Sequence, residues 1–156
     1  MLIRSPNNPF EAVVDVGLTP GISPHIVTST LHSYAKAVHQ DYGSLVTPSS
    51  PARPGEIVHL YLTGLGPLDQ AVPTGAPGPS APLAHPLAAL NCSLGVPFSP
   101  LQMPGLFYAP AMIGIYQAEL IIPDNAPDGT STLYCSTSDA SGMLITAAPL
   151  STTSAR

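Results

Sequence analysis

Histidines are the residues in this sequence best suited to bind a metal or to move protons, and three of them recur at intervals of seven, as His25, His32 and His39. On a helix these three would share one face, but successive members would lie about 10.5 Å apart along the axis. A zinc ion holds each ligand at about 2 Å, so neighbours this distant cannot share one ion by themselves. We therefore expect solvated or edge histidines at these positions and no metal site.

His59 and His85 are the other two histidines, and they could approach each other in the folded chain. A hydrolase or a metal-dependent enzyme would have to build its site from these two side chains and from carboxylates near them. Glu56, Asp69 and Glu119 are candidate acids, although Glu119 also fits the outward position of a strand and Glu56 a solvated strand start. The nucleophile motif G-x-S-x-G is absent. These residues favour a protein without catalysis or cofactor, and leave a small extracellular enzyme acting on polymers as an alternative.

Aromatic side chains could instead bind a sugar. A glycan-binding face would need two or three exposed, coplanar rings, and the sequence contains six tyrosines, three phenylalanines and no tryptophan. Tyr61 is the predicted outward residue of a strand, and Tyr108 lies in the turn sequence "FYAP". These two tyrosines are the best candidates for a carbohydrate-binding surface, with His59 and His85 as further ligand-binding candidates. The alternative for both rings is ordinary packing in the core or at its rim.

Two cysteines, Cys92 and Cys135, lie 43 positions apart without a CxxC motif or a Cys/His cluster, which argues against a closed zinc site. Cys92 alternates with leucines in "LNCSL", and Cys135 follows a leucine in "LYC", so both thiols should point inward if these runs are strands. We predict a cross-sheet disulfide between them. Two buried free thiols, as a reducing compartment would give, are the alternative.

Charged residues make up 8% of the chain, and the formal net charge is −5. The four basic side chains are scattered, so we expect no basic patch and no binding to nucleic acid. No apolar run approaches the roughly 18–20 residues that a membrane span needs. The start "MLIRSPNNPF" lacks the apolar core of a secretory signal, so either export is absent or the chain was cut from a longer protein. We favour the second.

Alternating apolar residues predict an all-β fold. In "EIVHLYLT" Val58, Leu60 and Leu62 share one face, and further strands are predicted near 88–94, 105–109, 114–122, 131–137 and 143–148. Turn sequences such as "PDNAPDGT" separate several of these runs. Short strands at roughly 8–12-residue spacing favour a β-sandwich. Residues 24–39 stay ambiguous, because Val27, Leu31, Tyr34 and Val38 form a helical stripe whereas β-branched residues favour strands.

Gly64 and Gly66 in "LTGLGP" raise the question of a phosphate-binding loop. Such a loop leads into a helix N-terminus, but here the glycines follow a strand and a proline-rich stretch, 66–86, follows them. Proline removes ladder donors, so this stretch is predicted to be a long extended connection. The glycines are therefore expected to supply permissive backbone angles where the strand leaves the sheet.

The sequence resembles the Solibacter-type carboxy-terminal domain of secreted acidobacterial proteins, whose character is similar to IPT/TIG-like immunoglobulin folds. The matching residues include "TPGI", "QDYGSLVTPSSPARPGEIVHLYLTGLGP", "VPTGAPGPSAPLA", "GLFYAPAMIGIYQAELIIP" and "APDGTSTL". The resemblance covers about residues 19–150. His39 departs from it, because the family tends to carry asparagine before "QD".

The resemblance implies an immunoglobulin-like β-sandwich at residues 20–150, with residues 1–19 as a linker or the tail of a preceding domain and 151–156 as a flexible tail. It implies a non-catalytic module of an exported or cell-surface bacterial protein, used for adhesion, attachment or spacing. The expected partners are an extracellular glycan or another protein module. The family's activity is not established, so it implies no site residues.

Overall fold

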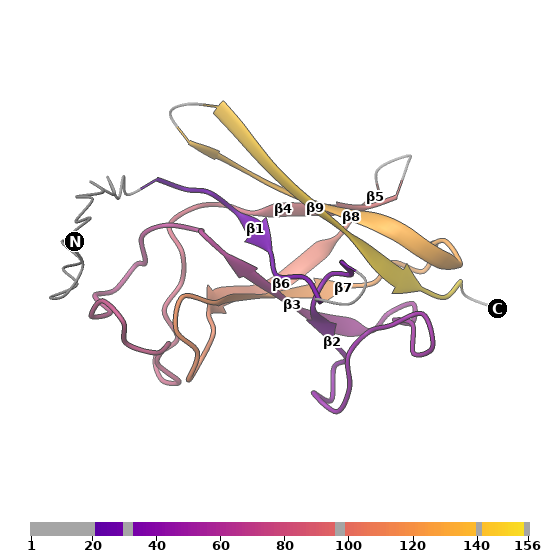
Figure 1. Cartoon of the computed structure of the whole chain (residues 1–156), viewed down its shortest axis with the longest axis horizontal. Helices are drawn as coiled ribbons and strands as arrows, with labels where there is room; N and C mark the ends of the chain where they lie inside the picture. Colours follow the sequence, from indigo (N-terminus) through magenta and orange to yellow (C-terminus); the bar gives the residue numbers. More distant parts are fainter. Residues whose placement is uncertain (1–20, 30–32, 96–98, 140–141, 155–156) are drawn as a thin grey trace, which may run out of the picture.

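The computed structural model describes residues 21–29, 33–95, 99–139 and 142–154, and these residues form nine strands and no helix. The first sheet has the order β1 (His25–Ile26), β3 (Ile57–Thr63), β7 (Tyr116–Ile121) and β6 (Gln102–Tyr108), and β2 (Ala37–Val38) also pairs with β3. The second sheet has the order β5 (Ser99–Pro100), β4 (Asn91–Leu94), β8 (Gly129–Asp139) and β9 (Gly142–Thr152). All pairings between these strands are antiparallel, and the two sheets form the layers seen in Figure 1. The predicted all-β sandwich is confirmed.

The core lies between the two layers and follows the predicted alternation. Val58, Leu60 and Leu62 of β3 are fully buried, and their register partners on β7 are buried as well. The second sheet contributes Leu94, Leu133, Cys135, Ala148 and Leu150 to the same cluster. Because side chains alternate between the faces of a strand, one apolar residue in two is enough to build this core.

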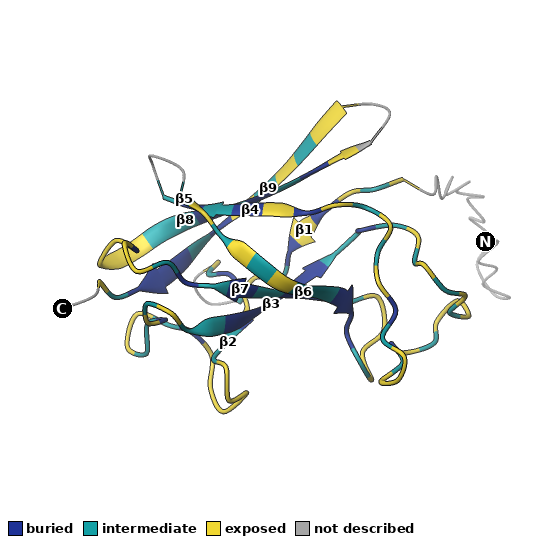
Figure 2. Cartoon of the chain, turned by 180° about the vertical axis from the view of Figure 1, so that it is seen from behind, coloured by how far each residue is buried: buried dark blue, intermediate teal, exposed yellow. Residues whose placement is uncertain are grey.

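The outer face of β3 is buried too, which the alternation did not predict. His59 and Tyr61 have exposed fractions of 4% and 8%, so the strand is buried from Val58 through Leu62 (Figure 2). Part of the cover is Tyr42, whose ring stacks on the ring of His59. A loop residue therefore converts what would be a solvent-facing side of the sheet into a second, smaller packed layer.

Residues 24–39 contain strands where the structure describes them. β1 and β2 both pair with the same edge of β3, at Leu62–Thr63 and at His59–Leu60. Between them, Thr28 bridges Ala35 and the Ser29 N–H donates to the Tyr34 carbonyl. The strand alternative holds for these positions, while residues 30–32 lie outside the described residues. The sequence "EAVVDV" at residues 11–16 also predicts a strand, and it too lies outside them.

Gly64 ends β3 in the way that the sequence predicted. Gly64 and Gly66 have φ values of +75° and +77°, in the left-handed region that glycine adopts without strain. A Cβ atom on Gly64 would lie 1.8 Å from the Ser23 carbonyl oxygen, and the Ser23 N–H donates to the Gly64 carbonyl at 2.8 Å. The two glycines therefore serve a turn and a close backbone approach.

The proline-rich connection between β3 and β4 contains no strand but is held at several points. Asp69 and His85 are joined by two bonds, from the Asp69 N–H to the His85 carbonyl at 2.8 Å and from the His85 N–H to the Asp69 carboxylate at 2.9 Å. Further along, the Gly78 N–H donates to the Met112 carbonyl and the Tyr108 hydroxyl to the Ala76 carbonyl. These bonds fix the connection against the first sheet.

The predicted disulfide between Cys92 and Cys135 is present, and both residues are buried. Its predicted placement across the two sheets is wrong, because the cysteines are register partners on β4 and β8, neighbouring strands of one sheet.

β9 continues through Thr152, two residues past the predicted end of the sandwich, because Ser151 and Thr152 pair with Thr130 and Gly129 of β8.

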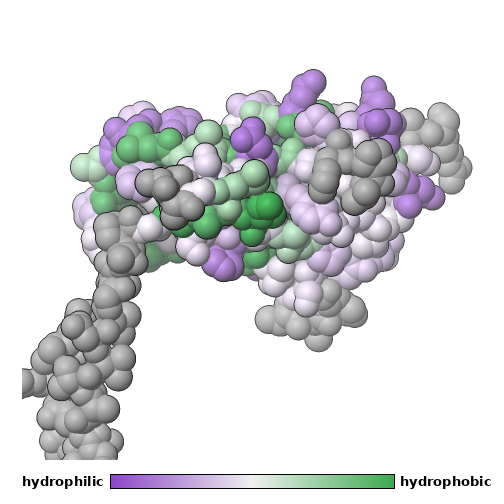
Figure 3. All heavy atoms as spheres, turned by 90° about the horizontal axis from the view of Figure 1, so that it is seen from above, coloured by the Kyte–Doolittle hydropathy of each residue, from purple (hydrophilic) through white to green (hydrophobic). Residues whose placement is uncertain are grey.

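The surface carries few charges. On the face shown in Figure 3, strongly hydrophilic residues are scattered and a green hydrophobic band crosses the middle. Large apolar side chains that are exposed include Met143 and Ile145 on β9, at 70% and 63%. These two residues alternate with half-buried neighbours, so they lie on the side of β9 that faces away from the core.

Candidate functional site

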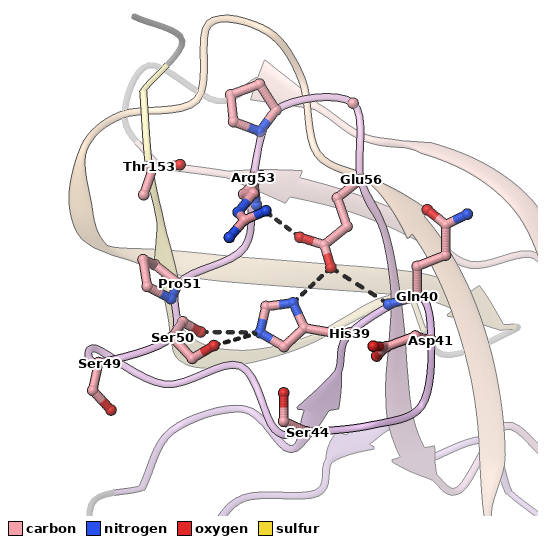
Figure 4. Close-up of a pocket in the computed structure, with 12 residues that line it drawn as sticks. His39, Gln40, Asp41, Ser44, Ser49, Ser50, Pro51, Arg53, Glu56 and Thr153 are labelled. Carbon is pink, nitrogen blue, oxygen red and sulfur yellow. Dashed lines mark hydrogen bonds and ion pairs between the residues drawn. The ribbon is translucent and has the colours of Figure 1, made fainter.

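A polar pocket of about 700 Å³ lies where the loops after β2 meet the start of β3 and the end of β9 (Figure 4). Three of its side chains, Ser50, His39 and Glu56, form a line of hydrogen bonds. The rest of the lining is mostly polar and contains Gln40, Asp41, Ser44, Ser49, Pro51, Arg53, Pro54, Gly55 and Thr153.

The Ser50–His39–Glu56 line has the order of a catalytic triad. The Ser50 hydroxyl lies 3.2 Å from His39 Nε2, and His39 Nδ1 lies 2.6 Å from Glu56 Oε1. In a serine hydrolase the carboxylate orients the imidazole, and the imidazole takes the proton of the nucleophile. Whether this line of residues can catalyse depends on the other contacts that Ser50, His39 and Glu56 make.

His39 faces acceptors on both sides of its ring. Nδ1 donates to the Glu56 carboxylate, and Nε2 also lies 3.1 Å from the Ser50 carbonyl oxygen, which can accept a proton but cannot donate one. Where Nε2 donates to this carbonyl, it has no lone pair with which to take the Ser50 proton. His39 thus clamps the loop after β2 to the segment that carries Ser50 and Glu56.

Glu56 is the acceptor at the centre of this clamp. Its Oε2 accepts from the Arg53 N–H at 2.9 Å, and Oε1 accepts from the Gln40 N–H at 3.4 Å in addition to His39. Burial raises the pKa of the Glu56 carboxyl, but the bonds from Arg53, His39 and Gln40 and the His39 charge together bring the pKa below its ordinary value of 4.5. Glu56 is therefore held ionised as a structural acceptor.

The backbone from residue 50 to residue 56 offers no free N–H donor for an oxyanion hole. Acyl transfer needs N–H donors that point at the developing negative charge beside the nucleophile. From residue 50 to residue 56 each backbone N–H is either absent, at Pro51 and Pro54, or already bonded. These bonds run from Ser50 to the Thr47 carbonyl, Ala52 to the Ser151 carbonyl, Arg53 to the Glu56 carboxylate, Gly55 to the Ile122 carbonyl and Glu56 to the Arg53 carbonyl.

The predicted histidine pair is not brought together by any contact between the described residues. His59 is buried on β3, whereas His85 is exposed and its Nδ1 donates to the Leu106 carbonyl at 2.8 Å. Tyr61 and Tyr108 are 8% and 7% exposed, so neither ring presents an open face for a sugar. Tyr61 is buried on the outer face of β3, and Tyr108 packs edge-on against Tyr116 in the core, with ring centroids 5.4 Å apart. Burial raises the pKa of both Tyr61 and Tyr116.

A second cluster surrounds His59 on the outer face of the first sheet. Tyr42 stacks on His59 with ring centroids 3.9 Å apart, and Gln117 Nε2 donates to the Tyr42 hydroxyl at 2.8 Å. Sequence reasoning missed both Tyr42 and the Ser50–His39–Glu56 line, since each depends on loop geometry. The signal that was present is the sequence "QDYG", a polar turn sequence that precedes the predicted strand "EIVHLYLT" by about a dozen residues.

The described residues contain no group of three or more histidine, cysteine, aspartate or glutamate side chains placed to hold a metal ion. His25 is exposed and its Nδ1 donates to the Ser23 carbonyl, while His32 lies outside the described residues. Over the same parts of the chain, the structure has no helix with the length and apolarity of a membrane span.

Comparison with models of protein families, with curated proteins and with solved structures finds no match. Fold and sites together define the chain as a two-sheet, all-β domain with a disulfide inside one sheet and a polar, loop-built pocket at its edge.

Proposed function

We propose that this protein is a non-catalytic module of an exported or cell-surface bacterial protein, used for adhesion, attachment or spacing. The two-sheet sandwich with a buried disulfide supports this proposal, and so does the resemblance to the Solibacter-type domain. The same resemblance supports an immunoglobulin-like arrangement of the sheets.

One observation carries the non-catalytic part of the proposal. Where the chain does align a serine, a histidine and a carboxylate, the imidazole is bonded on both sides and the surrounding backbone has no free N–H donor from residue 50 to residue 56. Removing a single oxyanion-hole donor from an enzyme slows it by about 10²–10³-fold. A serine whose own N–H and following backbone N–H groups are all bonded or absent is therefore better suited to structure than to acyl transfer.

The exported location is supported by the Cys92–Cys135 bond. Disulfides persist in oxidising compartments and are rare in reducing cytosol. The chain should therefore fold to its stable form in the periplasm of an expression host, where mass spectrometry after alkylation finds no free thiol. Two alkylated cysteines in periplasmic material would contradict this location.

The second candidate is a small extracellular hydrolase, favoured specifically by the Ser50–His39–Glu56 line. A fluorophosphonate probe and p-nitrophenyl acetate separate the two functions when applied to the wild-type protein, to Ser50→Ala and to the control Ser49→Ala. We expect no labelling and the same slow ester hydrolysis in all three proteins. Labelling that disappears in Ser50→Ala but persists in Ser49→Ala would replace the module with the enzyme.

A further inference from the structure

Tyr42 is held in an unfavourable position for a large aromatic residue. Its φ of +57° lies in the left-handed region, and its exposed fraction is 56%. This conformation is energetically unfavourable for a non-glycine residue, and it persists only where surrounding contacts hold the residue in place. A ring that stays more than half exposed gains only part of the free energy of burial, so the contacts that fix it point to a use at the surface.

Two buried side chains fix Tyr42 from beneath. Gln117 Nε2 donates to the Tyr42 hydroxyl at 2.8 Å and lies 3.1 Å from His59 Nδ1. With the amide donating to Nδ1, the other ring nitrogen, Nε2, donates to the Gln40 carbonyl at 3.3 Å. His59 and Gln117 are each 4% exposed. The Tyr42 ring is therefore pre-organised by groups that cannot themselves reach a ligand.

One face of the Tyr42 ring remains available. The stack on His59, with an interplanar angle of 10°, occupies one face, and the exposure of the residue leaves the opposite face open to solvent. Such a flat, rigid apolar surface on a polar loop can stack on a ligand without losing side-chain freedom on binding.

A carboxylate lies beside His59, the ring on which Tyr42 stacks. Glu119 is the register partner of His59 on β7, its Oε1 lies 3.8 Å from His59 Nδ1, and it accepts no hydrogen bond from a described residue. Gly105, the next residue across the sheet, leaves room for it, since a Cβ there would lie 2.7 Å from Glu119 Oε2. The carboxylate is 27% exposed and has acceptor capacity to offer a ligand.

We propose that Tyr42 and Glu119 form a saccharide-binding site, with the Tyr42 ring stacked on the C–H face of a pyranose and the Glu119 carboxylate accepting hydrogen bonds from its hydroxyls. This inference rests on the proposed attachment function and names its ligand class. Asp41 and Gln40, exposed on the same turn, extend the hydrogen-bonding surface toward the polar pocket. A cation would also suit a carboxylate and a ring, but aromatic cages for cations surround the charge with several rings.

The test is native affinity electrophoresis of the whole chain in gels that contain soluble β-glucan, xylan, mannan or α-glucan. At least one polysaccharide should retard the wild-type protein. Tyr42→Gly removes the ring and relieves the left-handed backbone, so it should fold and lose at least about tenfold in affinity. Tyr42→Phe keeps the ring and should stay within about threefold of the wild type, while Glu119→Gln should lose roughly three- to tenfold.

Leu87→Ala is the matched control, because this exposed apolar residue lies in the proline-rich connection and has an exposed fraction of 67%. It should bind as the wild type does, and circular dichroism should show the same β spectrum for all variants. Binding that survives Tyr42→Gly, or no retardation by any of the four polysaccharides, would overturn the saccharide site. Neither result would contradict the non-catalytic proposal, because that proposal is tested by probe labelling of Ser50 and not by binding to polysaccharides.

Discussion

Cys92 and Cys135 stand directly opposite each other on β4 and β8, with their Cα atoms 4.1 Å apart and both side chains buried. This close spacing is typical of a pair of residues that exchange no backbone hydrogen bonds, which is where side chains in an antiparallel sheet approach most nearly. The bond therefore links two residues that are 43 positions apart in the sequence and directly paired in the sheet.

Removing this bond should destabilise the protein strongly. The double variant Cys92→Ala/Cys135→Ala should lose about 4 kcal/mol of unfolding free energy on the loop-closure model, because the unfolded chain regains its freedom. Urea unfolding in oxidising buffer measures the change, and the wild type treated with reductant after unfolding serves as the comparison. Equal midpoints for the oxidised wild type and the double variant would show that the bond contributes nothing.

The Glu56 clamp should make stability depend on acidity. The pKa of Glu56 is lower in the folded chain than its ordinary value of 4.5, so its stabilisation is present above about that pH and is lost as pH falls through the lowered value. Glu56→Gln should lower the unfolding free energy at pH 7 by about 1–3 kcal/mol and flatten its decline between pH 5 and pH 2. Urea titrations at each pH measure this, with Asp124→Asn at an exposed turn as the control. If the unfolding free energy of Glu56→Gln fell with decreasing pH as steeply as that of the wild type, the pH dependence would come from other groups.

Alanine substitutions at Gly64 and Gly75 distinguish the cost of a left-handed backbone from the cost of a steric clash. Both have left-handed φ values, +75° and +80°, but an added Cβ at Gly64 meets the Ser23 carbonyl whereas nothing lies within 4 Å at Gly75. Gly75→Ala should therefore cost about 1–2 kcal/mol, the strain alone. Gly64→Ala should cost clearly more, because the segment before β1 must also move. Thermal unfolding of both variants gives the ranking, and equal losses would show that the approach of Ser23 to Gly64 does not matter.

Truncating a buried aliphatic side chain should destabilise the protein far more than truncating an exposed one of the same size. Leu133 on β8 is fully buried, and Leu133→Ala should lose about 2–5 kcal/mol through lost transfer energy and a cavity. Ile145 on β9 is 63% exposed, so Ile145→Ala should stay within about 0.5 kcal/mol of the wild type. Urea midpoints measure both. A large loss at Ile145 would mean that the outer side of β9 is covered in solution.

Much of the fold could be predicted because its signals are local. A strand such as β7 is specified by alternation over six residues, and turns are specified by proline, glycine and aspartate within a few positions. The same alternation placed both cysteines inward. Alternation does not reveal that β4 and β8 are neighbours. The position of the disulfide within one sheet therefore follows only from the strand pairing in the structure.

The sites depend on contacts between distant residues, and sequence patterns do not record these. Ser50 and Glu56 lie 11 and 17 positions from His39, and the loops that bring them to one ring have no periodic signal. Tyr42 is 75 positions from Gln117, and its placement over His59 follows from a left-handed turn that the residue type alone disfavours. The burial of His59 and Tyr61 has the same origin, since a loop covers a face that alternation assigns to solvent.

The proline-rich connection has a practical consequence for handling this protein. Six prolines between Pro67 and Pro86 fix their own φ angles, so the segment has fewer conformations to give up when it becomes ordered. The bonds at Asp69, His85 and Gly78 then anchor it along its length. The stretch from residue 67 to residue 86 contains no lysine or arginine, so it offers trypsin no cleavage site. Subtilisin cleaves many sequences, but under mild treatment it should leave this constrained stretch intact.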